Sequence, residues 1–169
     1  MKELQRHLPV MLGALRLIRQ TLPQVRARMV LPDDGLATQA KALGAPPEIE
    51  IQIGKLSEAL ATADLALAST GTVTMECAFF GVPAVTMYKT SWATYEIGKR
   101  IVKVKSLTMP NLLADEEVFP EFIQNAATPE NISRAALELL RNEPHRKAIQ
   151  AKLAQVVQSL GGPGASRRA

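Results

Sequence analysis

One stretch of this 169-residue chain decides its fold, and from Asp64 to Tyr88 it is DLALASTGTVTMECAFFGVPAVTMY. Residues 64–69 are a short apolar run of the kind that forms a buried strand. Residues 72–80 have the composition of a helix, and residues 82–88 are a second apolar run that begins beside a proline. A strand, a helix and a strand in this order predict two parallel strands joined by a helical crossover.

The same alternation of strands and helices extends to both sides of this stretch. Further strands are expected at residues 25–31 and 48–53, and helices at residues 8–22, 34–43, 55–63, 91–102, 129–141 and 144–160. Residues 108–115 are expected to form a loop. This pattern predicts an α/β fold with a Rossmann-like parallel sheet and helices on both faces. We expect residues 1–160 to form one domain and residues 161–169 to be a flexible, glycine-containing tail.

The composition excludes several classes of protein. Apolar residues make up 47% of the chain and charged residues 21%, which indicates a globular protein. One cysteine, Cys77, permits no disulfide within the chain, and His7 and His145 are too far apart in sequence to predict a metal site with it. No apolar run reaches the roughly 18–20 residues of a membrane span. The start of the chain has no secretory signal, so a cytoplasmic location is expected.

The net charge of +4 suits an anionic partner. Nucleic acid is not expected, because only 4% of residues are aromatic and none interleave with a basic segment as stacking platforms do. A basic run with apolar neighbours fits either a helix lying on an anionic membrane or the solvated face of a core helix. That run contains Lys99, Arg100, Lys103 and Lys105.

Small polar residues follow the first strand of the deciding stretch at Thr70, Gly71 and Thr72. Ligands of open parallel sheets bind outside the carboxyl ends of the strands, and the N–H groups and dipole of a helix start favour a phosphate. Gly71 allows a ligand to approach the backbone closely. The same residues also fit an ordinary capping turn, because the spacing is neither that of a P-loop nor GxGxxG.

Two charged side chains belong to the same candidate site. Glu76 stands among apolar residues, where its carboxylate can accept hydrogen bonds from a ribose; the alternative is a solvated carboxylate that stabilises the first turn of the helix. Lys89 follows the second strand at the same end of the sheet, where it either meets a phosphate or lies on the surface. Cys77 is predicted to be an inert buried thiol.

Three polar residues further along the chain complete the candidate site. Asn111 lies in the expected loop among apolar residues, so its amide must be satisfied by local backbone or by a ligand. Glu121 and Gln124 are three residues apart and in a helix would face the same way.

Residues 66–88 resemble the nucleotide-binding segment of lipid-A-disaccharide synthases. Three further motifs follow in that family's order: GKRIVKVK at residues 98–105, PNLLA at 110–114 and PEFIQ at 120–124. The segment with TGT, the glutamate and GVP fits many GT-B glycosyltransferases, whereas its combination with PNLLA is more specific. The resemblance is strongest over residues 66–124.

The resemblance implies the C-terminal, donor-binding half of a GT-B fold, in an enzyme at the cytoplasmic face of the inner membrane. The family joins UDP-2,3-diacylglucosamine to 2,3-diacylglucosamine 1-phosphate and releases UDP, with neither a metal nor a cofactor. By this resemblance a lipid-bearing UDP-sugar is the donor, peripheral membrane contact is expected, and a homodimer that exchanges C-terminal segments is a further partner arrangement. The residues implied at the donor site are Thr70, Gly71 and Thr72 at the diphosphate, Glu76 at the ribose, and Lys89, Asn111, Glu121 and Gln124 around them.

The sequence also departs from the family pattern. Family members carry a strand and a Pro-Gly-Ser-Arg loop just before the segment that matches Glu3, whereas this sequence begins at Met1. We therefore expect the first strand of the sheet to be absent. The N-terminal acceptor half, where the general base is expected, is absent too, so no catalytic residue is assigned and the chain alone is expected to be inactive. Lys89 stands where an arginine is common in the family. A lysine cannot make the bidentate contact that an arginine makes with a phosphate.

Two alternatives remain open at this point. The chain can be the donor domain of another UDP-sugar GT-B enzyme, which PNLLA argues against. It can also be a non-catalytic oligomerisation module, because an incomplete sheet exposes apolar edges that need covering.

Overall fold

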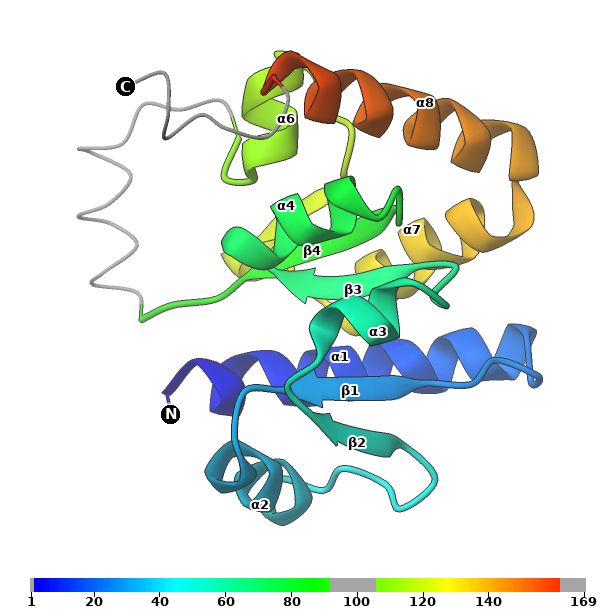
Figure 1. Cartoon of the computed structure of the whole chain (residues 1–169). Coiled ribbons are helices and arrows are strands. Elements are labelled where there is room, and N and C mark those ends of the chain that lie inside the picture. Colours follow the sequence, from blue (N-terminus) through cyan, green and yellow to red (C-terminus); the bar gives the residue numbers. More distant parts are fainter. Residues whose placement is uncertain (1, 92–105, 162–169) are drawn as a thin grey trace.

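The computed structural model of the chain describes residues 2–91 and 106–161 (Figure 1). The strands are β1 (Arg28–Leu31), β2 (Glu50–Ile53), β3 (Ala66–Ser69), β4 (Ala84–Tyr88) and β5 (Glu121–Ile123). The helices are α1 (Lys2–Thr21), α2 (Asp34–Ala42), α3 (Leu56–Leu60), α4 (Thr72–Phe79), α6 (Met109–Ala114), α7 (Pro129–Arg141) and α8 (Glu143–Ser159), with a short 3-10 turn, η1 (Gln124–Ala126), after β5.

All strand pairings are parallel, as the alternation of elements predicts. The strands form two sheets, one with the order β1–β2 and one with the order β3–β4–β5. In the first, Leu31 lies opposite Ile53; in the second, Ser69 lies opposite Met87. The arrows of both sheets point to the side on which α1 begins (Figure 1). The carboxyl ends of all five strands therefore lie on one side of the molecule.

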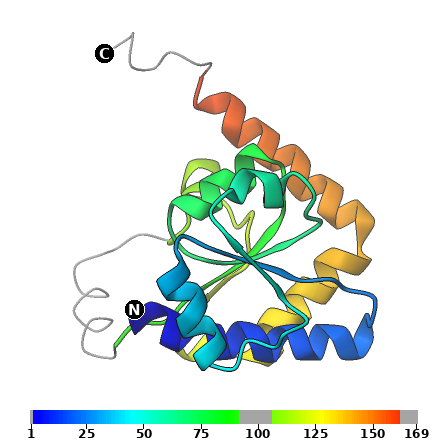
Figure 2. The same ribbon diagram turned by 60° about the horizontal axis from the view of Figure 1, so that its bottom comes forward.

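Helices cover the strands from both sides, which confirms the predicted architecture. In Figure 2, α1 lies on one side of the strands, and α4 and α6 lie on the other. The long helix α1 packs mainly against α7, and α4 packs against both α6 and α8. The close approach of α1 to α7 occurs at Gly13, where a Cβ atom would lie 2.8 Å from Pro129 Cγ.

Capping residues fix where several helices begin. Asp33 caps α2, since its Oδ1 accepts a hydrogen bond from Leu36 N at 2.8 Å. Thr128 caps α7 by accepting from Asn131 N at 3.2 Å, directly before Pro129. Asp and Thr are residue types favoured at the N-cap, and proline is favoured at the first position of a helix.

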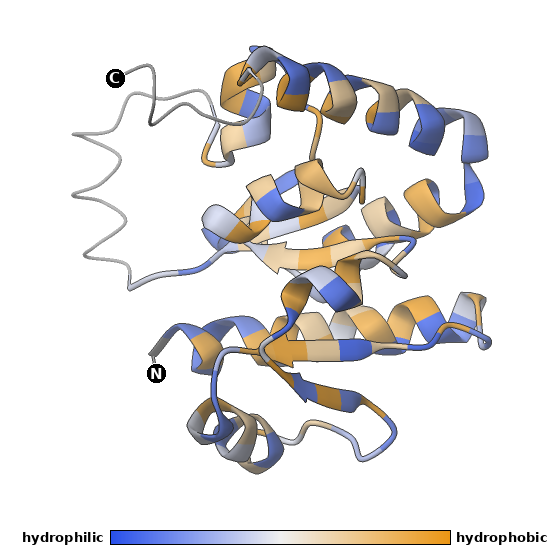
Figure 3. Ribbon diagram, in the orientation of Figure 1, coloured by the Kyte–Doolittle hydropathy of each residue, from blue (hydrophilic) through white to orange (hydrophobic). Residues whose placement is uncertain are grey.

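The apolar core is divided into two clusters, one beside each sheet. The larger cluster surrounds β3 and β4 and includes Met87, Phe119 and Leu139. The smaller cluster joins Leu8 of α1 to Leu31 of β1 and to α2. Figure 3 shows the same distribution, with apolar residues concentrated on β3 and β4 and hydrophilic residues along the outer side of α8.

One predicted element is wrong. Residues 108–115 are not a loop, because α6 begins after Thr108 and holds Pro110 in its first turn, where a proline costs no helical hydrogen bond. Glu121 and Gln124 do not share a helix. Glu121 begins strand β5, and Gln124 begins the 3-10 turn η1 with a φ of 51°. The helix expected at residues 91–102 lies almost wholly outside the described residues, as does the tail from residue 162.

Candidate functional site

Three loops meet at the carboxyl edge of the three-stranded sheet. Thr70 follows β3, Lys89 follows β4 and Gln124 follows β5. The strand register places the three loops at the same height along the sheet, because Ser69 lies opposite Met87 and Tyr88 lies opposite Ile123. Residues that are up to 54 positions apart in the sequence thus converge where ligands of open parallel sheets bind.

The first loop opens α4 without a side-chain cap. Gly71 has a φ of 135°, which residues with a Cβ rarely adopt, and this turns the chain from β3 into the helix. The Gly71 carbonyl accepts from Thr74 N at 3.1 Å and from Thr74 Oγ1 at 2.7 Å. The N–H groups of Thr72 and Val73 make no hydrogen bond within the described residues. They are therefore available to an anion at the positive end of the helix.

Thr74 and Glu76 face opposite ways on this helix. The Thr74 side chain is fully buried and donates to the Gly71 carbonyl, which stabilises the turn before α4. The Glu76 side chain is exposed. Glu76 lies four residues after Thr72, so both side chains share the outer face of α4. The Glu76 carboxylate accepts no hydrogen bond from the residues that the structure describes, so it can accept hydrogen bonds from hydroxyl groups. The Glu76 side chain therefore lies on the exposed outer face of α4, one turn after Thr72.

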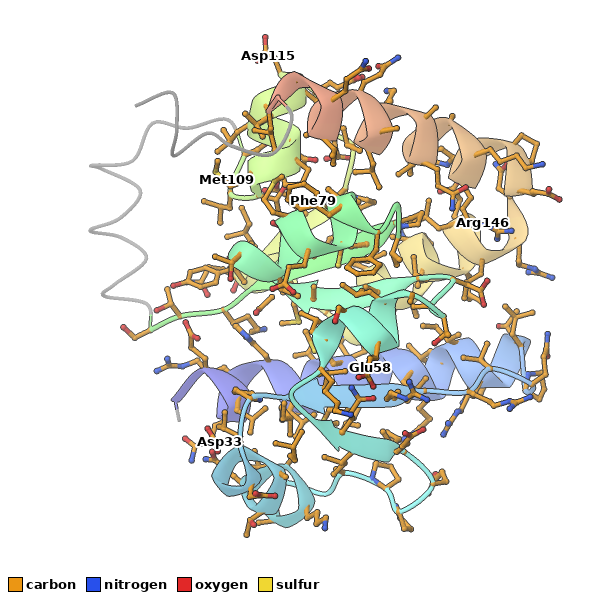
Figure 4. All side chains as sticks on the ribbon, in the orientation of Figure 1. Asp33, Glu58, Phe79, Met109, Asp115 and Arg146 are labelled. Atoms are coloured by element: carbon orange, nitrogen blue, oxygen red, sulfur yellow. The ribbon has the colours of Figure 1, made fainter. Side chains whose placement is uncertain are left out.

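Two exposed aromatic residues follow Glu76 on α4 and just after it. Phe79 is 60% exposed and Phe80 44% exposed. Met109, at the start of α6, is 47% exposed. Figure 4 shows Phe79 and Met109 near each other on the neighbouring helices α4 and α6. This side of the molecule therefore presents apolar surface next to the outer face of α4.

Lys89 is tied to other parts of the chain. Its Nζ donates to the carbonyl of Ala127 at 3.1 Å, and its backbone N–H donates to His7 Nε2 at 3.0 Å. The ammonium group has two further N–H donors. Lys89 lies at the predicted edge, with one of its three side-chain donors already used to hold the loop before α7.

His7 is a residue of this edge that the sequence did not reveal. It belongs to α1, is 6% exposed, and its ring lies 6.0 Å from that of Tyr88. Burial lowers the pKa of His7 from its ordinary value of 6.5. The neutral ring can accept the Lys89 N–H, so His7 joins the start of α1 to the end of β4. A lone histidine in a helix, 82 residues before its partner, gives no signal of this contact in the sequence.

Gln124 combines a strained backbone with an unsatisfied amide. Its φ of 51° is unusual for a residue other than glycine. Its Oε1 accepts from Thr90 N at 3.3 Å, while its buried Nε2 has no hydrogen-bond partner among residues 2–91 and 106–161. Buried donors are nearly always paired in proteins, so an unpaired donor at a loop cluster indicates a place for a ligand acceptor.

Asn111 is satisfied entirely by local groups. It is 1% exposed, and its Nδ2 donates to the carbonyl of Phe119 and to Glu121 Oε1, both at 2.8 Å. Its Oδ1 accepts from Val118 N at 2.9 Å and Phe119 N at 2.8 Å. Of the two possibilities that the sequence leaves open for this amide, the structure shows the local one. Asn111 fixes the chain that leads from α6 into β5.

Glu121 is clamped at the start of α6. Its Oε1 accepts from Thr108 N at 3.0 Å, from Thr108 Oγ1 at 2.6 Å and from Asn111 Nδ2 at 2.8 Å, while its Oε2 accepts from Leu107 N at 2.8 Å. It lies opposite Thr86, two positions before the end of β4. The sequence-predicted residues thus separate into an edge group and a supporting pair. The edge group is Thr70, Gly71, Thr72, Glu76, Lys89 and Gln124.

The remaining reactive groups do not add to this site. Burial, with the nearby Glu76 carboxylate, raises the pKa of the Cys77 thiol to about 11, as expected of an inert core cysteine. Within residues 2–91 and 106–161, no group of three or more histidine, cysteine or carboxylate side chains has the geometry to hold a metal ion. No helix in the same part of the chain is long and apolar enough to cross a membrane.

Comparison with a solved structure establishes the class of fold. The crystal structure of the GtfA/B complex, a GT-B glycosyltransferase, superimposes with a TM-score of 0.52 at 17% identity. The match covers 90% of this chain and 30% of the other. The parallel strands with helices on both faces therefore share their fold with part of that structure, and this fold is of the GT-B type.

Sequence comparisons identify the family. The model of the lipid-A-disaccharide synthetase family matches residues 1–169, and the chain belongs to this family. Lipid-A-disaccharide synthases from Solibacter usitatus and Trichlorobacter lovleyi are 40% and 37% identical to it. The one from Syntrophus aciditrophicus is 36% identical over 99% of this chain. The chain spans 44% of the length of each of these three relatives and matches their C-terminal part.

Proposed function

We propose that this chain binds UDP-2,3-diacylglucosamine as the donor half of a lipid-A-disaccharide synthase. The sugar is transferred to 2,3-diacylglucosamine 1-phosphate on a partner half that supplies the acceptor site and the general base, so the chain alone is inactive. The observation that carries the proposal is the uncapped start of α4 at the carboxyl edge. There, two free N–H groups and two threonine hydroxyls lie one helical turn before an unpartnered carboxylate.

These groups match the parts of a nucleoside diphosphate. Thr70, Gly71 and Thr72 hold the diphosphate, where backbone N–H groups and the helix dipole stabilise the negative charge that develops on the departing UDP. The Glu76 carboxylate accepts hydrogen bonds from the two ribose hydroxyl groups. The unpaired Nε2 of Gln124 donates to an acceptor on the bound nucleotide. No metal is required, because fixed dipoles supply the stabilisation.

The supporting residues keep this edge in shape. Lys89 bonds to Ala127 and offers its remaining donors to the phosphates. Asn111 and Glu121 position Gln124 rather than contact the donor. Their hydrogen bond joins α6 to β5, the strand that ends immediately before Gln124. Exposed Phe79 and Phe80 lie one turn beyond Glu76, and apolar surface at this place supports a donor that carries acyl chains.

The location and assembly of the protein follow from the same proposal. A lipid donor and acceptor require work at a membrane surface, so we propose peripheral contact with the cytoplasmic side of the inner membrane. The basic run with Lys99 and Arg100, which fits either a membrane-bound helix or a solvated helix face, lies outside the described residues. We also propose that the chain forms a homodimer by exchange of C-terminal segments. Light scattering should then give the mass of a dimer, and the mass of a monomer would contradict this part of the proposal.

Calorimetric titration with UDP tests donor binding. We expect the chain to bind UDP with a dissociation constant of about 1 mM or below, equivalent to about −4 kcal/mol. Glu76→Gln keeps the size of the side chain but weakens its hydrogen bonds to hydroxyls. Because bonds to charged groups contribute about 1.5–3 kcal/mol, we expect affinity to fall at least about tenfold.

The matched control is Glu143→Gln, which removes the same charge from an exposed residue at the start of α8. It loses only a surface ion pair with Lys147 at 2.7 Å and should bind UDP as the unmodified chain does. No heat from a folded protein at millimolar UDP, or equal loss in both variants, contradicts the proposal.

A further inference from the structure

One ring nitrogen of His7 lies within hydrogen-bond distance of both backbone groups of Lys89. His7 Nε2 is 3.0 Å from Lys89 N and 3.1 Å from Lys89 O. A ring nitrogen without a proton accepts a hydrogen bond, and one with a proton donates, so Nε2 makes only one of these two bonds at a time. The protonation of Nε2 therefore decides which backbone group of Lys89 is held.

The unprotonated nitrogen gives the better-satisfied arrangement. The N–H group of Lys89 has no other acceptor among residues 2–91 and 106–161. An orphaned N–H group is rarer in proteins than an orphaned carbonyl, so folding favours the bond from Lys89 N to Nε2. The His7 ring is 6% exposed, which leaves water little access to replace this bond.

Two further hydrogen bonds tie the same segment to the carboxyl edge. Lys89 Nζ donates to the carbonyl of Ala127 at 3.1 Å, and Thr90 N donates to Gln124 Oε1 at 3.3 Å. The second bond fixes the side-chain amide of Gln124, whose buried Nε2 has no partner within the described part of the chain. A shift of residues 89–90 therefore reaches the side chain that the proposed function assigns to the ligand.

Protonation of His7 disturbs this arrangement. With a proton on Nε2, the ring no longer accepts from Lys89 N, and two nitrogens that each carry a hydrogen face each other at 3.0 Å. The ring can then donate only to the Lys89 carbonyl. The repulsion between the two N–H groups moves the Lys89 peptide group away from the position that also sets Thr90.

The surroundings of His7 keep its ring neutral near pH 7. Burial is the main cause, and it lowers the pKa of His7 from its ordinary value of 6.5. Among the described residues, the Lys89 carbonyl and Glu3 favour a positive ring, whereas Arg6 and the Lys89 ammonium oppose one. The ring of Tyr88 also faces it, with centroids 6.0 Å apart. The His7 ring therefore takes up its proton only as the pH falls below 6.5.

We propose that His7 is a positioning residue for nucleotide binding: its unprotonated Nε2 holds residues 89–90 where Lys89 and Gln124 meet the ligand, and protonation of the ring weakens binding. His7 acts through Lys89 and Thr90 and does not touch the ligand. The inference rests on the proposed function, because it concerns the same site. If only the neutral form binds, the apparent dissociation constant rises by up to about tenfold for each pH unit below the pKa of the ring.

The His7 ring reports on this coupling in a nuclear magnetic resonance titration of the isotope-labelled chain with UDP. A bound anion that acts only through its charge stabilises the protonated ring and raises the pKa of His7. If UDP instead binds the form with the unprotonated ring, the coupling is reciprocal and saturating UDP lowers that pKa. We expect the lower pKa, and an unchanged or raised pKa overturns the proposal.

Two substitutions separate the protonation of the ring from its size. His7→Gln can accept from Lys89 N through its amide oxygen but does not ionise, whereas His7→Leu removes the acceptor. In calorimetric titration with UDP at about pH 7.5, His7→Gln should bind within about twofold of the unmodified chain, and His7→Leu at least about threefold more weakly.

The same titrations at about pH 5 test the role of the proton. The terminal phosphate of UDP itself titrates near pH 6, but it does so for every protein alike, so the ratio of dissociation constants at one pH is compared. Between about pH 7.5 and about pH 5, the unmodified chain should lose at least about twofold more affinity than His7→Gln.

Glu143→Gln, at the exposed start of α8, is the control and should follow the unmodified chain at both pH values. Urea unfolding at each pH confirms that the compared proteins are folded. The proposal is overturned if the unmodified chain and His7→Gln lose the same affinity in acid. No binding of UDP to the folded chain at about pH 7.5 contradicts the proposed function, and this inference with it.

Discussion

Gln124 and His7 show how single residues shape the carboxyl edge. Gln124 holds a φ of 51° and keeps a buried amide donor unpaired, two costs that a structure seldom bears without a role for the residue. His7 is buried, which lowers its pKa, and its Nε2 accepts a hydrogen bond from the backbone N–H of Lys89. Under the proposed function, Gln124 donates to the bound ligand, and His7 holds the end of β4 in place beside it.

His7 makes stability depend on pH. Because burial lowers its pKa in the folded protein, the unfolded chain takes up a proton at higher pH than the folded protein does. The resulting stability is present above the ordinary pKa of 6.5 and is lost as pH falls through the folded-state pKa. Urea unfolding at about pH 7.5 and about pH 5 should show a smaller acid loss for His7→Gln than for the unmodified chain.

Asn125→Gln is the control for this measurement, because Asn125 is an exposed residue of η1 whose side chain does not ionise. It should retain the pH dependence of the unmodified chain. If His7→Gln has that same pH dependence too, His7 does not titrate with folding.

At the scale of elements, the junction between α6 and β5 depends on Asn111. In Asn111→Ala, the N–H groups of Val118 and Phe119 lose their acceptor and Glu121 loses a donor. Each buried unpaired group costs about 1–3 kcal/mol, so the free energy of unfolding should fall by at least about 3 kcal/mol in urea. Asn125→Ala, at an exposed asparagine of η1, should change it by less than about 0.5 kcal/mol. If both variants lower the free energy of unfolding equally, Asn111 does not hold the junction between α6 and β5.

The contact of α1 with α7 depends on a small residue. In Gly13→Ala, the new Cβ would lie 2.8 Å from Pro129 Cγ and 3.1 Å from Pro129 Cβ, and a proline ring at a helix start cannot move aside easily. The helices must separate, so we expect a loss of about 1–3 kcal/mol in urea unfolding.

Gly35→Ala provides the comparison within α2, where the new Cβ meets only the side-chain oxygen of Asp33, at 3.1 Å. Its stability should change by less than about 1 kcal/mol. A Gly13→Ala protein as stable as this control would show that the packing of α1 on α7 tolerates a wider spacing.

Elements with local signals were predictable from the sequence. The start of α7 follows from Thr128 and Pro129, and β3 and β4 follow from their apolar runs. α6 and β5 were missed, because Pro110 suggests a loop and a three-residue strand is too short for an alternating pattern to appear. Their arrangement depends on Asn111 and Glu121, whose hydrogen bonds span 7 to 14 residues.

The sequence also predicted only those parts of the candidate site that have local signals. Thr70, Gly71 and Thr72 could be placed because a strand that ends in small polar residues before a helix has a known geometry. The bonds of Lys89 to His7 and Ala127 could not, since they join parts of the chain 82 and 38 residues apart. The supporting role of Glu121 gave no signal in the sequence, because its hydrogen bonds reach residues 10 to 14 positions away.

For the whole molecule, the central claim is that the carboxyl edge of the three-stranded sheet binds the UDP part of a lipid-bearing sugar donor. Titration of the isotope-labelled protein with UDP, followed by nuclear magnetic resonance, tests this directly. We predict that the amide signals of Gly71, Thr72 and Val73, together with the side-chain amide of Gln124, shift in a saturable way. Saturable shifts confined to other residues, or no shifts in a folded protein, would contradict the claim.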